Sequence, residues 1–423
     1  MIKINPVHRA LVNLLTSKAR SMAVARLALL LSLCLLSAVR LRLIVQSWSV
    51  DYIHLRDSVQ YYLIGKALLA GEYLYTPMNE LVLKFAGANW YSRHPAPYPP
   101  SMALLCAPLG SLDLLTVPRV WFVLSLAALI ATVCMLVHWY RGKLDLPAIL
   151  LLLVIVIGWY PVWIDLVQGQ VSILLLALLT GAWLLLRKGQ DVAAGLLLGL
   201  SLSIKLVAWP LLLYFLIKRQ WRLLIAAGAL TLLLHLAAAL VTGIQPVLDY
   251  YFRVTGEVLP YYQAHWYNVS LWTLGWRLFA GTGSTMLDVP TAPPLVSLPS
   301  LAPVVSGVVV AGMLVLGLSW ALRLKQRDTA LAMVIYTSLL VSPISWIHYY
   351  SMALIGLVIG IRYLKQNNYP PNLNVAYAGL VLALFLSTDW IQGLVRSPSI
   401  LSGPQAAAVS FSVSMLNLLP AAA

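Results

Sequence analysis

The sequence has little acidic charge: only 13 aspartates and glutamates occur among its 423 residues, and charged residues of both signs make up 10% of the chain. Hydrophobic residues make up 61%, and the mean hydropathy is +0.86. A soluble protein of this length could not bury so much apolar surface, so lipid is the expected solvent for most of the chain. This composition excludes an ordinary water-soluble domain and favours one membrane bundle.

Cysteine is scarce as well, and familiar cofactor motifs are missing. Cys34, Cys106 and Cys134 lie in apolar runs without paired spacing, so we interpret them as small hydrophobic side chains rather than disulfides or metal ligands. The chain contains no Walker loop, no GxGxxG after a strand, no HExxH and no repeat of 20–50 residues. These absences give no reason to expect a metal or a cofactor.

Basic residues outnumber acids and give a formal charge of +15. They form no single patch, which argues against nucleic acid as a partner; they are spread over short loops, which is typical of membrane topology signals. If the N-terminus lies inside, the inner segments hold 17 of the 28 lysines and arginines. Those segments are 1–26, 141–143, 187–188, 218–222, 323–327 and 362–365. The bias predicts a multi-pass protein of the cytoplasmic (inner) membrane.

Apolar runs of spanning length recur along the chain. The run 191–217 is too long for one span and has Lys205 and Pro210 in its middle, so we interpret it as two short helices, 191–204 and 206–217, that meet at Lys205. The sequence then predicts an all-α bundle of about 12 transmembrane helices in one domain, residues 1–423, with an uncleaved first span. The other runs are 24–46, 118–140, 146–164, 170–187, 222–243, 301–323, 328–345, 347–364, 373–393 and 405–420.

Two long segments, 47–117 and 244–300, are expected on the outer, extracytoplasmic side. Both are rich in Tyr, Trp and Pro. Such aromatic side chains suit the headgroup interface, and their faces also stack on sugar rings. The stretch 98–109 is apolar but too short to cross the bilayer, so we expect a juxtamembrane helix there.

Asp57 follows the first span directly. A charge at the mouth of a membrane bundle is costly unless it is paired or takes part in chemistry. On a helix, Gln60, Tyr61 and Tyr62 lie within one turn of it, and this polar-aromatic cluster favours a functional role. The alternative is a solvated acid beside Arg56.

Other polar residues occur near predicted outer helix ends. Lys205 could neutralise a phosphate as a point charge, and Arg277 could do so bidentately; the alternative for Lys205 is snorkelling to the interface. His348 could bind a phosphate or a carboxylate, or be a structural group at a helix end. Gln170 offers a neutral hydrogen bond or a helix cap. The sequon Asn268-Val-Ser270 is a weak match to a glycosylation site.

The order of these residues carries more information than any one of them. The ordered set is Asp57 with Tyr61 and Tyr62, then Gly71, Leu74 and Tyr75, then Tyr98-Pro99-Pro100, Gly169-Gln170, Gly195 and Gly199 before Lys205, Asn268, Ser270 and Arg277, and SPxSWxHY at 342–349. From about residue 24 to 395, the chain resembles glycosyltransferase family 87, the polyprenyl-phosphate-sugar-dependent mannosyltransferases with a GT-C fold. The usual Lys-Pro step reads Lys205-Leu206 here, with Pro210 delayed.

The resemblance implies an enzyme whose active site faces the outside. The donor would be a polyprenyl-phosphate sugar, most often mannose, and the acceptor a glycolipid or glycan, with membrane lipid around them. The family's base maps onto Asp57 and its histidine onto His348. The candidate cations over the phosphate are Lys205 and Arg277. The candidate sugar and lipid contacts are Tyr61, Tyr62, Tyr98, Gln170, Asn268, Ser270 and Trp346.

The expected reaction inverts the anomeric carbon. One carboxylate can deprotonate the attacking hydroxyl, and a phosphodiester leaving group needs no protonating acid, so one base with cationic stabilisation suffices. Three alternatives stay open: a lipid or solute transporter, which would show paired half-sequences and charges near the midplane; a scaffold subunit without chemistry; and a transferase that uses another prenyl-phosphate sugar, such as arabinose or glucose.

Overall fold

The computed structural model describes residues 6–48, 56–87, 93–283 and 292–367. Within these ranges the chain folds into helices and short turns and contains no β-strand beyond two isolated bridges, so the predicted all-α class is confirmed. The helices in chain order are α1 (Pro6–Gln46), α2 (Ser58–Leu69), α3 (Met78–Ala86), α4 (Pro100–Gly110), α5 (Val117–Arg141), α6 (Leu146–Ile157), α7 (Tyr160–Gln168), α8 (Ser172–Arg187), α9 (Asp191–Ile204), η2 (Leu206–Ala208), α10 (Trp209–Ile217), α11 (Trp221–Thr242), α12 (Gln245–Asp249), η3 (Tyr250–Val254), α13 (Thr255–Gln263), α14 (Trp272–Phe279), α15 (Leu301–Arg323), α16 (Arg327–Val341), η4 (Ile347–Met352) and α17 (Ala353–Gln366).

Several helices are long and apolar enough to cross a membrane. The described residues contain five such segments, and the bent pair α6–α7 could supply a sixth. Four further apolar helices have 10–17 residues. The predicted spans 373–393 and 405–420 lie outside the described residues, so the count of about 12 stays a prediction. The five segments are Leu27–Gln46, Val117–Arg141, Trp221–Thr242, Leu301–Arg323 and Ile347–Gln366.

The run expected as a span at 146–164 is apolar enough to cross a membrane, but it is divided into two helices, because the chain bends by 73° between α6 and α7. Pro161 has no backbone N–H to continue the helix and is found at the start of α7. The first helix compensates for the break: Ser37 Oγ donates a 2.6 Å hydrogen bond to the carbonyl of Val154, and the Arg40 guanidinium donates to that of Gly158. These bonds satisfy carbonyl groups at the broken end and set the direction of α7.

The break predicted at Lys205 is confirmed. Helix α9 ends at Ile204, Lys205 has an extended backbone with φ −159° and ψ 134°, and η2 and α10 follow. Lys205 therefore caps the C-terminal end of α9 and is not part of a helical face.

The backbones of helices α2 and α4 approach each other closely at Gly65 and Gly110. A Cβ atom at Gly65 would lie 2.2 Å from the carbonyl oxygen of Cys106, and one at Gly110 would lie 2.4 Å from the backbone of Gly65. Only glycine permits this approach of two backbones. The predicted helix at 98–109 is therefore present as α4, and it packs directly against α2, the helix that begins after Asp57.

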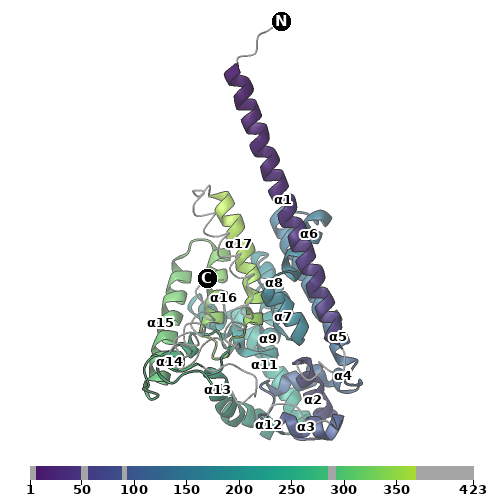
Figure 1. Cartoon of the computed structure of the whole chain (residues 1–423). Helices are drawn as coiled ribbons and strands as arrows, with labels where there is room; N and C mark the ends of the chain where they lie inside the picture. The colour runs from purple at the N-terminus through teal and green to yellow at the C-terminus, as the bar shows by residue number, and fades with distance from the viewer. Residues whose placement is uncertain (1–5, 49–55, 88–92, 284–291, 368–423) are drawn as a thin grey trace.

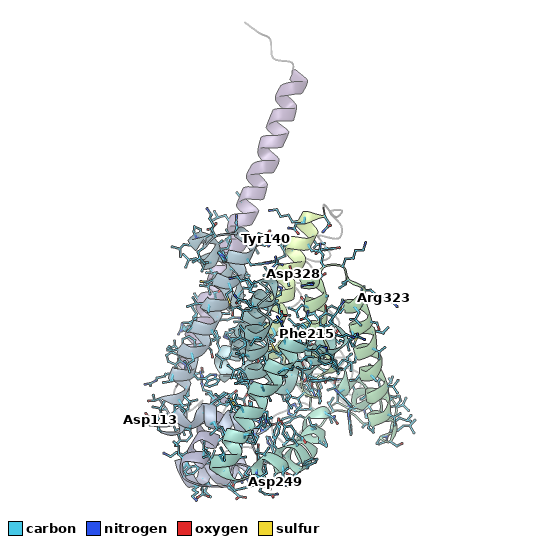
Figure 2. All side chains as sticks on the ribbon, turned by 180° about the vertical axis from the view of Figure 1, so that it is seen from behind. Asp113, Tyr140, Phe215, Asp249, Arg323 and Asp328 are labelled. Carbon is cyan, nitrogen blue, oxygen red and sulfur yellow. The ribbon has the colours of Figure 1, made fainter. Side chains whose placement is uncertain are left out.

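The two predicted outer segments occupy one end of the molecule. Figure 1 shows α2, α3, α4, α12, α13 and α14 together at the end where α1 terminates, which we call the outer-segment end. In Figure 2, Asp113 and Asp249 lie at this end, whereas Arg323 and Asp328 lie towards the other. The basic loop at 323–327 is thus separated from both aromatic-rich segments along the long axis.

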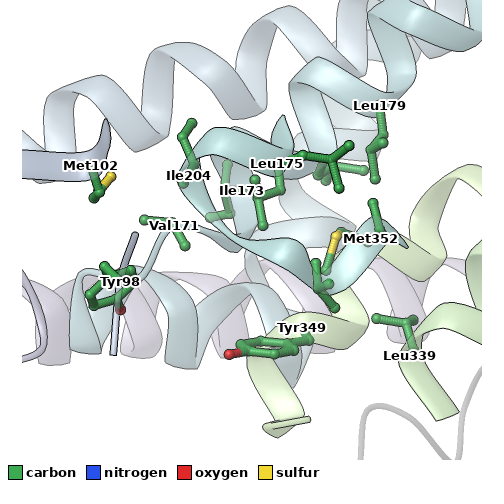
Figure 3. Close-up of a cluster of buried hydrophobic side chains, with 14 of the residues drawn as sticks. Tyr98, Met102, Val171, Ile173, Leu175, Leu179, Ile204, Leu339, Tyr349 and Met352 are labelled. Carbon is green, nitrogen blue, oxygen red and sulfur yellow. The ribbon is translucent and has the colours of Figure 1, made fainter. Parts of the chain in front are cut away.

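The apolar core continues into the outer-segment end. Figure 3 shows Tyr98 and Met102 beside Val171 and Ile204, with Tyr349 below them, all buried. The first outer segment is therefore packed against α8, α9 and η4. This packing brings together polar residues that are far apart in the sequence.

Candidate active site

Asp57 is held where α1 ends, α2 begins and α7 ends. Its backbone N–H donates a 2.8 Å hydrogen bond to the carbonyl of Gln168. The preceding residue, Arg56, is buried, and its Nε donates to the carbonyl of Ser47 over 2.9 Å. Arg56 therefore anchors this segment to the end of α1, and the Asp57 side chain keeps partial exposure.

Two side-chain amides hold the Asp57 carboxylate. Gln60 Nε2 donates to Oδ1 over 2.6 Å, and Gln170 Nε2 donates to Oδ2. Gln170 is buried and follows Gly169, whose positive φ of +68° suits glycine at the turn between α7 and α8. An ionised carboxylate has about four lone-pair sites, so two amide donors fix its direction and leave it able to accept a proton.

Lys205 brings positive charge to the same place. Its Nζ lies 5.1 Å from the ring centroid of Tyr98 and 4.5 Å from that of Tyr349, within the range of cation–π attraction. The ammonium interacts electrostatically with the carboxylates of Asp57 and Asp165. Its side chain is only partly buried. The ammonium thus stands between aromatic faces, close to two acids.

His348 joins this group from η4. The imidazole is buried, packs against the Tyr349 ring with centroids 4.9 Å apart and interacts electrostatically with Lys205. Within the described residues, its Nε2 makes no hydrogen bond. The structure therefore places Lys205 within electrostatic range of both Asp57 and His348, and we call these residues with Asp165, Gln170, Tyr98 and Tyr349 the Asp57 cluster.

Tyrosines border the cluster on the α2 side. The hydroxyls of Tyr61 and Tyr98 are 3.2 Å apart, and Tyr61 packs on Trp121 with centroids 4.3 Å apart. Burial and the nearby Asp57 carboxylate raise the pKa of Tyr98, so its hydroxyl stays protonated. Tyr62 is also buried, but its electrostatic partner is Asp113. The structure brings Tyr61 and Tyr98 to the cluster, and within the described residues no hydrogen bond, ring contact or electrostatic interaction joins Tyr62 to Asp57, Lys205 or His348.

A second group of residues, which we call the Asn268 group, contains Tyr262, Asn268, Ser270 and Arg277. Asn268 joins the members of this group by hydrogen bonds. Its amide nitrogen donates to the carbonyls of Tyr262 and Pro343, each over 3.0 Å. Its Oδ1 accepts from the backbone N–H of Ser270 over 3.1 Å and of Ser345 over 3.0 Å. Asn268 therefore joins the second outer segment to the loop before η4. Ser270 is fully buried beside it.

Arg277 stabilises the main chain of this second group. Its Nη2 donates to the carbonyls of Trp266 and Asn268 over 2.9 Å each, and its Nε donates to Thr273 Oγ1 over 3.2 Å. Burial lowers the pKa of Arg277 to about 9, so it is charged at neutral pH. The structure places this guanidinium among backbone carbonyls.

Aromatic contacts connect the two groups. The Trp346 ring packs on Tyr262 and His265, with centroid distances of 5.4 and 5.1 Å, and Trp346 is two residues before His348. Tyr262 also shares a 2.6 Å hydrogen bond with Nε2 of His94 from the first outer segment. Trp346 therefore lies between the Asn268 group and the Asp57 cluster.

Sequence reasoning left Asp165, Tyr349, His94, Tyr262 and His265 out of the candidate site. Asp165 gave a signal as an acid in an apolar helix next to the GQ step, and Tyr349 stands beside His348. His94 and Tyr262 gave none, because their contact joins residues 168 positions apart in the sequence. His265 gave none, because its contact with Trp346 also joins two separate segments. Within the described ranges, no three His, Cys, Asp or Glu side chains are grouped to hold a metal ion.

The fold and the cluster define an integral membrane protein with a carboxylate, an ammonium and an imidazole together at one end. The model of glycosyltransferase family 87 matches residues 97–343, more than half of the chain. The chain therefore belongs to glycosyltransferase family 87. The matched range contains Gln170, Lys205 and Asn268; Asp57 precedes it and His348 follows its end.

Two curated proteins are similar over a shorter stretch. They are the alpha-(1->3)-arabinofuranosyltransferases of Mycobacterium tuberculosis strains CDC 1551 / Oshkosh and ATCC 25618 / H37Rv, each 33% identical over 144 residues. The match covers 33% of this chain and 33% of each relative, so it spans about a third of the length of these proteins. No solved structure matches the chain.

Proposed function

We propose that this glycosyltransferase moves a sugar from a polyprenyl-phosphate donor to a hydroxyl group of a glycolipid or glycan at the outer face of the cytoplasmic membrane. The observation that carries the proposal is that an amide-held carboxylate, Asp57, and the ammonium of Lys205 belong to one cluster. A base and a phosphate-binding cation are the two groups that such a transfer requires.

In the proposed step, Asp57 takes the proton of the acceptor hydroxyl as its oxygen attacks the anomeric carbon of the donor. The new glycosidic bond forms on one face of the sugar while the carbon–oxygen bond to phosphate breaks on the other, so the anomeric configuration inverts. The bonding electrons leave with the phosphate oxygen. The products are the glycosylated acceptor, the polyprenyl phosphate and a protonated Asp57.

Lys205 and His348 are the groups proposed to meet the phosphate. The leaving phosphate gains negative charge as the bond breaks, and an ammonium fixed nearby stabilises that charge most where water is excluded. His348 adds a buried ring nitrogen that has no hydrogen-bond partner among the described residues. Arg277 is proposed to act indirectly, because its guanidinium donates hydrogen bonds to the carbonyls of Trp266 and Asn268 and so stabilises the backbone there.

The position of the cluster suits a substrate that is part lipid and part sugar. It lies where the apolar core reaches the outer-segment end, next to Tyr98 and Tyr349. Segments 47–117 and 244–300 are proposed to face the exterior, on a GT-C bundle of about 12 spans formed by the single domain 1–423. Tyr61, Tyr98 and Trp346 are the proposed aromatic contacts of the sugars, with Tyr62, Gln170, Asn268 and Ser270 supporting them.

The family resemblance favours a hexose, mannose, as the transferred sugar. Arabinofuranose is the second candidate, because both matched relatives are named arabinofuranosyltransferases. The two donors present the same phosphate and lipid, and they differ only in the ring that Asp57 and the aromatic residues would meet. The geometry of the cluster is compatible with both.

A direct test supplies membranes containing the protein with radiolabelled polyprenyl-phosphate mannose or polyprenyl-phosphate arabinofuranose, in separate reactions. The proposal predicts label in a glycolipid or glycan from one donor, and loss of that label with Asp57→Asn. Transfer from neither donor, or undiminished transfer with Asp57→Asn, would contradict the proposal. The reaction that yields label identifies the sugar.

A further inference from the structure

The turn from Gly71 to Tyr75 has no part in the proposed chemistry so far. It follows α2, and Gly71 has a positive φ of +67° that suits glycine. Tyr75 is buried, and its hydroxyl donates a 3.0 Å hydrogen bond to the backbone carbonyl of Tyr98. Burial raises the pKa of the Tyr75 hydroxyl, so it stays protonated and can act as this donor. The turn therefore joins the end of α2 to the segment that leads into α4.

Tyr98 is held at both of its ends. Its carbonyl accepts the hydrogen bond from Tyr75, and its hydroxyl lies 3.2 Å from that of Tyr61. Tyr98 also precedes Pro99, and a proline disfavours the helical backbone conformation for the residue before it. These constraints fix the direction of the Tyr98 ring. Lys205 Nζ lies over the face of this ring, 5.1 Å from its centroid, within the range of cation–π attraction.

The same turn contacts the second outer segment. The Tyr75 ring lies at 24° to the Tyr250 ring of η3, with centroids 6.1 Å apart, and Tyr250 is buried. Tyr73 is exposed; its hydroxyl donates to the Asp249 carboxylate and accepts from Arg253 Nη2 over 3.0 Å. Tyr73 therefore joins the two outer segments at the surface, and Tyr75 joins them in the interior.

We propose that Tyr75 is a positioning residue: its hydroxyl fixes the backbone of Tyr98 so that the Tyr98 ring holds the Lys205 ammonium in place for the donor phosphate. The catalytic part of this inference rests on the proposed function. A lysine side chain is flexible, and a cation that is ordered before the substrate arrives requires no reorganisation during the reaction. Tyr75 acts through Tyr98 and Lys205, and Asp57 remains the base.

The competing explanation is that Tyr75 only fills the space between the two outer segments. Tyr75→Phe separates the two explanations, because phenylalanine keeps the ring that packs on Tyr250 and removes only the hydroxyl. Tyr73→Phe is the matched control, since it removes a hydroxyl from the same turn at an exposed position. Lys205→Met removes the ammonium and keeps most of the apolar stem.

The first readout is the rate at which formaldehyde and a borane reductant methylate Lys205 in the purified full-length protein in detergent, measured by peptide mass spectrometry. Contact with the Tyr98 ring covers the amine and favours its unreactive, charged form. Tyr75→Phe is therefore expected to speed methylation of Lys205 by about threefold or more, and Tyr73→Phe to leave it unchanged. Lys365, an exposed lysine on α17, is the internal reference. An unchanged rate at Lys205 in Tyr75→Phe would overturn the inference.

The second readout is the single-turnover rate of sugar transfer. Tyr75→Phe is expected to lower this rate by about 10-fold, since small displacements of a group near the reaction have effects of this size. The variant with both Tyr75→Phe and Lys205→Met should be within about twofold of Lys205→Met alone, because both changes act on the same cation. Undiminished transfer by Tyr75→Phe, or a double variant slowed by the product of the two single factors, would overturn the inference. A hydroxyl with only a structural role would lower the unfolding midpoint without slowing transfer by the folded protein.

The two readouts also separate this inference from the proposed function. If the original protein transfers no sugar from either donor, the proposed function fails, while methylation still decides whether Tyr75 positions Lys205. If transfer occurs and Tyr75→Phe changes neither readout, the inference fails and the proposed function stands. If Tyr75→Phe does not fold, the hydroxyl is required for the fold itself, and the inference is overturned.

Discussion

The carboxylate of Asp57 accepts a hydrogen bond from the side-chain amide of Gln170, which lies 113 residues later in the chain. The link runs from the start of α2 to the turn between α7 and α8, and a second bond, from the Asp57 N–H to the carbonyl of Gln168, runs beside it. The proposed base is therefore oriented by a turn of another helix. The mechanism depends on this arrangement.

Asp57→Asn tests the base itself. Asparagine keeps the size of the side chain but cannot take a proton, so the transfer rate is expected to fall by about 100- to 10,000-fold. The measurement is single-turnover transfer from the labelled donor in detergent. Asp113→Asn serves as control and should transfer at the original rate, because Asp113 is exposed and away from the cluster. A rate for Asp57→Asn within twofold of this control would contradict the assignment.

Gln170→Ala tests the orientation of the base. The variant removes a hydrogen bond to a charged acceptor, and such bonds contribute about 1.5–3 kcal/mol. We expect kcat to fall by about 10- to 100-fold with little change in the KM for the donor. Steady-state kinetics with the labelled donor measure both parameters. Gln326→Ala, an exposed glutamine before α16, is the matched control. A rise in KM with unchanged kcat would show that Gln170 binds substrate instead.

Asn268→Ala tests the second group. The variant removes hydrogen bonds to Tyr262, Pro343, Ser270 and Ser345 and leaves their backbone groups buried. The expected loss is about 4 kcal/mol of unfolding free energy, since each of the four buried bonds contributes about 1 kcal/mol. Thermal unfolding in detergent measures it. Asn367→Ala removes one exposed bond to Tyr363 and should change the midpoint little. Equal effects of the two variants would refute a joining role for Asn268.

His265 predicts a pH dependence of stability. Burial, with a smaller effect of Arg277, lowers the pKa of His265 to about 4 from the ordinary value near 6.5. The unfolded chain therefore binds a proton that the folded protein does not, so stability is lost as the pH falls from about 6.5 towards 4. Burial lowers the pKa of His94 as well, which acts in the same direction.

The unfolding midpoint in detergent should thus be lower at pH 5 than at pH 7.5, and His265→Asn should reduce that difference. His138, an exposed histidine near the end of α5, provides the comparison as His138→Asn. If His265→Asn and His138→Asn show the same difference between the two pH values as the original protein, the buried imidazole is not its source.

Much of this arrangement follows from local sequence. The break at Lys205 was predictable, since a charge and Pro210 interrupt a run too long for one span. The helix at 98–109 and the location of the aromatic-rich segments 47–117 and 244–300 at one end of the molecule follow in the same way from composition. The Asp57 carboxylate was identifiable because it is an acid next to a span.

Other features depend on contacts between distant segments. The bend between α6 and α7 has a local signal in Pro161, but the hydropathy of 146–164 is that of an unbroken span, and carbonyls at the break are satisfied by Ser37 and Arg40 of another helix. Arg277 looked like a free cation by residue type, yet its donors are directed to the carbonyls of Trp266 and Asn268. Hydropathy and spacing do not report which partner a buried donor meets.

The central claim is that Asp57 and Lys205 act together on a lipid-linked sugar. The most direct measurement is the single-turnover rate of label transfer from polyprenyl-phosphate mannose and polyprenyl-phosphate arabinofuranose, for the original protein, Asp57→Asn and Lys205→Met. We expect transfer from one donor by the original protein, with both variants slower by about 100-fold or more. Full transfer by either variant, or none by the original protein, would contradict the account.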